Sequence, residues 1–138
     1  LLDRAYEGET LNLCKNAGIP YMAFSPTAQG LLAKPMSQED LEMPTRKHHF
    51  LYQNSVYPHA RKVWEVVRDI AEELGRKPVE VALAWVLTRD NIFTAIVGSR
   101  KPKQVREFAK SAELKLSPDQ LHRLTTASDQ FPMIKKGH

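Results

Sequence analysis

The chain has 138 residues, of which 42% are hydrophobic and 26% are charged, a composition typical of one soluble globular domain or a large part of one. Its apolar runs are far shorter than the ~20 residues that a membrane-spanning helix needs, and no basic segment followed by an apolar core opens it, so we expect a cytoplasmic protein without a membrane partner. The formal charge of +4 is spread along the chain, so we expect no nucleic-acid partner.

The first predicted elements are a short helix and a buried strand. Residues 5–17 place Leu11 and Cys14 three positions apart, and Gly18 follows, as expected of a helix that ends at a left-handed glycine. The apolar run IPYMAF, residues 19–24, predicts the strand. Cys14 is the only cysteine, which excludes an internal disulfide and a multi-cysteine metal site.

The middle of the chain predicts an irregular stretch followed by two helices. The turn SPTAQG stops the first strand, and residues 33–56 are polar and lack a sustained period, so we expect a long, mobile loop there. Residues 58–74 restore a helical period that ends at Gly75, and a second helix begins near Pro78 and runs to about Arg89. The residues expected to face the core are Val63, Val66, Val67, Ile70 and Leu74 on the first helix, and Val79, Ala82, Leu83 and Val86 on the second.

The last third predicts a second strand and two more helices. IFTAIV, residues 92–97, is the strand, and a helix over Pro102–Ser111 follows. Ser117 and Gln120 form a capping-box pattern that starts the final helix. The alternation of strand and helix favours βα units around a parallel sheet, so the class is α/β. Two strands are too few for a parallel sheet covered on both faces, so we expect further strands outside these residues. The stripe expected to be buried on the third helix is Val105, Phe108, Ala109 and Ala112.

Two turns follow the carboxyl ends of the predicted strands, where α/β folds place ligand sites. In VGSRKP, Gly98 lets a ligand approach the backbone, Ser99 offers a hydroxyl and Arg100 offers a fork of donors. The helix from Pro102 adds N–H groups and the positive end of its dipole. These groups suit a phosphate monoester better than a carboxylate. An ordinary strand-to-helix turn with solvated charges stays open as the alternative, and Ser25 could likewise be a turn-forming hydroxyl.

Two segments, GIPYMAFSPTAQGLLAK and VALAWVLTRDNIFTAIVGSRKPKQVREFA, together resemble the C-terminal half of the aldo-keto reductases, the NADP(H)-dependent (β/α)8 barrel (TIM barrel) oxidoreductases. The resemblance covers essentially the whole chain. It implies that residues 1–4 end strand six, that residues 19–24 and 92–97 are strands seven and eight, and that the last helix lies across the barrel. An intact barrel has about 250 residues, so residues 1–138 would be one partial domain.

The resemblance also implies which residues bind NADP(H). Phe24 matches the aromatic position that stacks on the nicotinamide, and Ser25 matches the serine at the pyrophosphate. Ser99 and Arg100 match the positions that hold the adenosine 2′-phosphate. Phe108 replaces an asparagine that commonly binds adenine, and we expect it to join the core instead. The expected cofactor-binding residues are Phe24, Ser25, Thr27, Gln29, Gly98, Ser99, Arg100, Gln104 and Glu107.

The family's catalytic tetrad of Asp, Tyr, Lys and His comes from the first half of the barrel, and no residue here matches it. Tyr52 and Tyr57 are expected at best to line a substrate pocket, and the adjacent His48 and His49 point apart in regular structure, so no catalytic residue and no metal ligand is assigned.

The resemblance therefore implies the C-terminal part of a reductase that converts small aldehydes or ketones to alcohols, with the N-terminal half of the barrel as its missing partner. Two alternatives stay open: a cofactor-sensing regulatory or binding subunit of the same fold, and a truncated product without activity.

Overall fold

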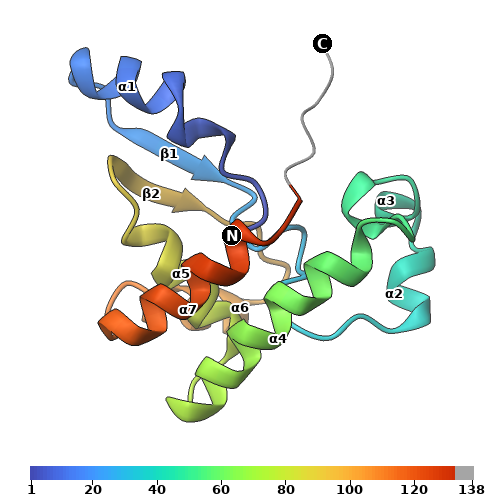
Figure 1. Ribbon diagram of the computed structural model, residues 1–138. Helices are drawn as coiled ribbons and strands as arrows, with labels where there is room; N and C mark the ends of the chain where they lie inside the picture. Colours follow the sequence, from blue (N-terminus) through green and yellow to red (C-terminus); the bar gives the residue numbers. More distant parts are fainter. Residues whose placement is uncertain (133–138) are drawn as a thin grey trace.

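A computed structural model describes residues 1–132 of the chain. These residues form short and long helices around one two-stranded sheet (Figure 1). In chain order the elements are the 3-10 helix η1 (Ala5–Glu7), α1 (Glu9–Asn16), β1 (Tyr21–Phe24), α2 (Gln38–Glu42), α3 (Pro44–Lys47), the 3-10 helix η2 (Phe50–Tyr52), α4 (Tyr57–Glu73), α5 (Pro78–Leu87), β2 (Ile92–Ile96), α6 (Pro102–Lys110) and α7 (Pro118–Asp129).

The two strands are parallel neighbours, as predicted. Phe24, the last residue of β1, lies opposite Ile96, the last residue of β2, and the register shifts between Tyr21 and Met22. The connection between the strands contains the helices α2 to α5. Because parallel strands end at the same edge of a sheet, the turns after Phe24 and Ile96 leave the sheet side by side.

The core lies where α4, α5 and α7 pack together on one side of β2 (Figure 1). On α4 the predicted stripe is confirmed, since Val63, Val67 and Ile70 are at most 2% exposed. Helix α5 differs from the prediction of one inward face, because all its residues from Val79 to Val86 are buried. It contacts α4, α6 and β2, so little of its circumference is left to face solvent.

The prediction of a long structureless loop over residues 33–56 is wrong. The segment contains α2, α3 and η2. Ser37 caps α2, because its side chain accepts a hydrogen bond from the backbone N–H of Asp40 at 3.1 Å while the Asp40 carboxylate accepts one from the backbone N–H of Ser37 at 3.2 Å. This reciprocal capping box starts a helix that is too short to show a hydrophobic period.

Two smaller expectations also fail. Residues 1–4 form no strand; they contact the end of α7 instead, where the Ser128 hydroxyl donates to the carbonyl oxygen of Leu1 at 2.6 Å. On α6 the stripe expected in the core is largely exposed: Val105 is 54% exposed, and Ala109 and Ala112 are exposed as well. The less exposed face of α6 carries Gln104, Glu107 and Phe108, so Phe108 is the one stripe residue that is partly covered.

The two strands carry large apolar side chains that are more than half exposed. They are Met22 and Phe24 on β1 and Phe93 and Ile96 on β2. No helix among residues 1–132 is long and apolar enough to cross a membrane.

Candidate functional site

The turn after β1 has an unusual backbone. Ser25, Ala28 and Gln29 have φ values of +50°, +50° and +55°, and Gly30 has a φ of +93°. Residues with side chains rarely adopt such angles, and they cost roughly 1–3 kcal/mol each unless the surrounding structure holds them. The composition of SPTAQG predicts a turn here but does not predict its strained backbone.

Side chains from the segment with the short helices hold this turn. The Tyr52 hydroxyl donates to the carbonyl oxygens of Ala28 at 3.2 Å and Gln29 at 3.3 Å, and burial raises the pKa of Tyr52, so the hydroxyl keeps its proton at neutral pH. Arg46 reaches the same Gln29 oxygen at 3.4 Å and lies 5.9 Å from the centre of the Tyr52 ring. Tyr52 is thus a positioning residue, 7% exposed, rather than the pocket-lining residue of a loose loop.

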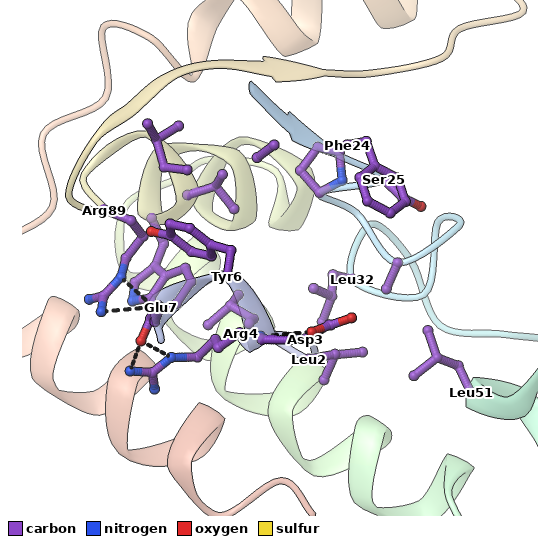
Figure 2. A pocket seen from close by; sticks show the side chains of 18 of the residues that line it. Leu2, Asp3, Arg4, Tyr6, Glu7, Phe24, Ser25, Leu32, Leu51 and Arg89 are labelled. Carbon is purple, nitrogen blue, oxygen red and sulfur yellow. Dashed lines mark hydrogen bonds and ion pairs between the residues drawn. The ribbon is translucent and has the colours of Figure 1, made fainter. Parts of the chain in front are cut away.

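A cavity of about 420 Å³ opens beside this turn (Figure 2). Phe24, Ser25 and Gln29 of the predicted cofactor set line it, while Thr27 does not. Phe24 is 75% exposed, which leaves its ring accessible to a ligand. Leu32 and Leu51 contribute apolar wall.

The far end of the cavity is built from charged residues, with Glu7 between Arg4 and Arg89 (Figure 2). One Glu7 oxygen accepts from Arg4 at 2.8 and 2.6 Å, and the other accepts from Arg89 at 3.2 and 3.0 Å. Burial alone would raise the pKa of Glu7, but the hydrogen bonds and charges of the two arginines outweigh it and hold that pKa below its usual range. Arg89 also lies 4.7 Å from the centre of the Trp85 ring. The spacing of Arg4 and Glu7 is visible in the sequence, but their link to Arg89, 82 positions after Glu7, is not.

The turn after β2 is open and positively charged. Gly98, Ser99 and Arg100 are exposed, and a side chain at Gly98 would meet no atom within 4 Å. Within residues 1–132 no carboxylate forms an ion pair with any of the four cations in this turn and in the first two turns of α6. These cations are Arg100, Lys101, Lys103 and Arg106.

Two predicted site residues on α6 are occupied within the chain. The amide oxygen of Gln104 accepts hydrogen bonds from the backbone N–H groups of Arg100 at 2.8 Å and Lys101 at 3.1 Å. Gln104 therefore caps the start of the helix, and these two N–H groups, which precede Pro102, are engaged within the chain. Glu107 forms an ion pair with Lys77, and this contact lowers the pKa of Glu107.

The structure thus brings the two turns to the same edge of the sheet without merging them into one cavity. Phe24, Ser25 and Gln29 line the cavity, whereas Gly98, Ser99 and Arg100 lie outside its lining. Gln104 supports the second turn, and Glu107 ties α6 to the residue before α5. A ligand long enough to touch Phe24 and Arg100 would follow the carboxyl edge of both strands.

Comparisons with known proteins connect this geometry to one family. The chain is 33% identical over 132 residues to an uncharacterized oxidoreductase, YrpG, of Bacillus subtilis (strain 168), and 28% identical over 117 residues to the NADH-specific methylglyoxal reductase of Escherichia coli (strain K12). The matches cover 96% and 85% of this chain but only 38% and 36% of those proteins. The chain therefore spans little more than a third of the length of these relatives.

The crystal structure of the thermostable aldo-keto reductase Tm1743, in complex with the inhibitor epalrestat, has the same fold with a TM-score of 0.61. The match covers 91% of this chain and 36% of that one at 22% identity. The model of the Aldo/keto reductase family matches residues 1–129. The chain belongs to the aldo/keto reductase family.

Proposed function

We propose that residues 1–138 are the C-terminal, cofactor-binding portion of a (β/α)8 reductase that uses NADP(H) to convert aldehydes or ketones to alcohols. The observation that carries this proposal is a set of four cations, in the turn after β2 and in the first two turns of α6, that form no ion pair within residues 1–132. They lie beside the end of the strand that pairs with Phe24. A positive turn at a helix N-terminus favours a phosphate dianion. The 2′-phosphate that distinguishes NADPH from NADH is such a group.

Each of the two turns would hold a different part of the cofactor. Phe24, exposed at the end of β1, offers a flat apolar surface on which a nicotinamide ring can stack. Ser25 and Gln29 of the strained turn line the same cavity, and a serine hydroxyl together with backbone N–H groups would suit the pyrophosphate. Ser99 and Arg100 would then hold the phosphate at the adenosine end, with Arg100 as a two-pronged donor.

The nicotinamide, when bound, supplies the hydride for the carbonyl carbon. The residues of this chain bind the cofactor, orient its ring at the cavity and exclude water through apolar wall residues such as Leu32 and Leu51. No residue of this chain is assigned the proton transfer to the carbonyl oxygen. In this proposal that group lies in the remainder of the barrel, as does most of the substrate pocket.

The test is a fluorescence titration of the intact protein with NADPH and, separately, with NADH. Replacing Arg100 with alanine removes a charge-assisted contact to the 2′-phosphate, so the Kd for NADPH should rise by about tenfold or more. The Kd for NADH, which lacks this phosphate, should change little. Both cofactors are needed because one relative carries the name of an NADH-specific enzyme.

Lys110→Ala is the matched control, since Lys110 is an exposed cation in the last turn of the same helix. Equal losses of NADPH affinity in Arg100→Ala and Lys110→Ala would show a diffuse charge effect and contradict a specific phosphate site. NADPH binding that survives Arg100→Ala unchanged would remove the phosphate assignment altogether.

A further inference from the structure

The turn between β2 and α6 is held by few contacts of its own. Its exposed residues are Gly98, Ser99, Arg100 and Lys101, so no burial of their side chains fixes the course of the backbone. Among the N–H groups of residues 98–101, those of Arg100 and Lys101 are the two that find an acceptor within residues 1–132. Both donate to one atom, Oε1 of Gln104, at 2.8 and 3.1 Å. The shape of the turn therefore depends on one side chain of the following helix.

Arg100 depends on this contact more than Lys101 does. Lys101 has an extended backbone, with φ −139° and ψ 140°, and the ring of Pro102 after it favours that conformation independently. Arg100 does not precede a proline, so its backbone lacks this second restraint. Its N–H also makes the shorter of the two hydrogen bonds to Gln104, at 2.8 Å. Loss of the Gln104 acceptor would therefore loosen Arg100 first.

The helix that carries Gln104 is itself held in place. Gln104 lies in the first turn of α6 and is partly buried. Helix α6 contacts α5, and Glu107, one turn further on, forms an ion pair with Lys77, the residue before α5. The acceptor thus sits on an anchored element, whereas the Arg100 side chain that it restrains through the backbone is exposed.

The direction of the Arg100 backbone matters because a guanidinium recognises a phosphate by geometry. Two parallel N–H groups bind two phosphate oxygens only when the planar fork approaches correctly. No carboxylate among the described residues forms an ion pair with Arg100 and orients its side chain. When a turn adopts the binding geometry for only a fraction of the time, the apparent Kd rises by the inverse of that fraction.

We propose that Gln104 is a positioning residue for NADPH preference: it holds the backbone of Arg100 so that the guanidinium reaches the 2′-phosphate. This role rests on the proposed function, from which it takes the phosphate site at Arg100. It replaces the direct cofactor contact that the family resemblance implies for Gln104. The Nε2 group of Gln104 has no acceptor within residues 1–132, so a direct contact through Nε2 is the alternative that the experiment must separate.

The experiment is a double-mutant cycle, read by fluorescence titration of the intact protein with NADPH and with NADH. An effect that passes through Arg100 cannot exceed the effect of removing the Arg100 side chain. With about a tenfold loss of NADPH affinity in Arg100→Ala, we expect about a three- to fivefold loss in Gln104→Ala. The Kd for NADH should change by less than about twofold in Gln104→Ala, because NADH has no 2′-phosphate. Adding Gln104→Ala to Arg100→Ala should cause no further loss of NADPH affinity.

Gln120→Ala is the matched control. Gln120 occupies the same position at the start of α7, where its Oε1 accepts from the backbone N–H of Ser117 at 3.0 Å. Gln120→Ala therefore removes the same kind of capping contact from a helix that the proposed cofactor does not touch. We expect Gln104→Ala and Gln120→Ala to lower the melting temperature alike, while Gln120→Ala leaves the Kd for NADPH unchanged.

A loss of NADPH affinity in Gln104→Ala that disappears in the Arg100→Ala background would support the positioning role. Additive losses would show that Gln104 contacts the cofactor itself, and equal losses for NADPH and NADH would show a general structural role; either result overturns the inference. If Arg100→Ala weakens NADPH binding but Gln104→Ala does not, the inference fails and the phosphate site stands. If Arg100→Ala has no effect, the proposed phosphate site fails and the role of Gln104 falls with it.

Discussion

Replacing Tyr52 with phenylalanine removes the hydroxyl that holds the turn after β1. That hydroxyl donates to Ala28 at 3.2 Å and to Gln29 at 3.3 Å. Both carbonyl oxygens keep one other donor, since the Leu31 N–H reaches the Ala28 oxygen at 3.2 Å and Arg46 reaches the Gln29 oxygen at 3.4 Å. The variant therefore loses hydrogen bonds without leaving a bare acceptor, so we expect the free energy of unfolding to fall by about 1–2 kcal/mol.

The same substitution should also weaken cofactor binding. Ser25, Ala28 and Gln29 hold positive φ angles, and a turn that is less tightly held will relax toward ordinary angles part of the time. Because only the fraction with the correct geometry binds well, we expect the Kd for NADPH to rise several-fold. Chemical denaturation and a fluorescence titration of the intact protein measure the two effects.

Tyr57→Phe is the matched control for Tyr52→Phe. The two rings stack with centroids 6.5 Å apart, but the Tyr57 hydroxyl makes no hydrogen bond with the described residues. If the two variants have the same stability and the same NADPH affinity, the turn is held by its own backbone and the Tyr52 hydroxyl does not position it.

Two further predictions concern the charged and capping groups. Glu7→Gln should lower the free energy of unfolding by about 1–3 kcal/mol at neutral pH. Because the folded-state pKa of Glu7 lies below the ordinary value of 4.5, the stability contributed by the Glu7 carboxylate is present above about pH 4.5 and is lost as the pH falls through the folded-state pKa. Denaturation curves at about pH 7 and about pH 3 should therefore show a smaller difference in unfolding free energy between wild type and Glu7→Gln at the lower pH. A difference that is independent of pH would contradict this role of Glu7. Ser37→Ala should cost about 1 kcal/mol and speed hydrogen exchange in α2 through loss of the cap, whereas exchange no faster than in the exposed control Ser55→Ala would count against it.

Local patterns predicted the elements that depend on local physics. Helix α4 has a long apolar stripe, and α7 has a capping box at Ser117 and Gln120 that the structure confirms. The helices within residues 33–56 were not predicted, because α2 has five residues and α3 has four, which is too few for a hydrophobic period to appear. Its one local signal was Ser37 with Asp40 three residues later, a capping pair that uses aspartate in place of glutamate or glutamine.

Contacts between distant segments were beyond local reasoning. Tyr52 lies 24 positions after the carbonyl that it holds, and Arg89 lies 82 positions after Glu7. The burial of α5 on all sides likewise depends on three neighbours that only the fold brings together. The placement of Phe24 and Ser25 beside a cavity followed from the rule that α/β folds place ligands at the carboxyl ends of strands. The same rule does not predict that the Gln104 amide oxygen accepts hydrogen bonds from the N–H groups of Arg100 and Lys101.

If the turns after β1 and β2 hold one cofactor between them, NADPH should protect both turns at once. Hydrogen–deuterium exchange of the intact protein, measured with and without saturating NADPH, reports this protection. We expect slower exchange in residues 24–32 and in residues 97–104 together, with the protection at 97–104 reduced when NADH replaces NADPH. Protection of one turn without the other, or of neither, would contradict it.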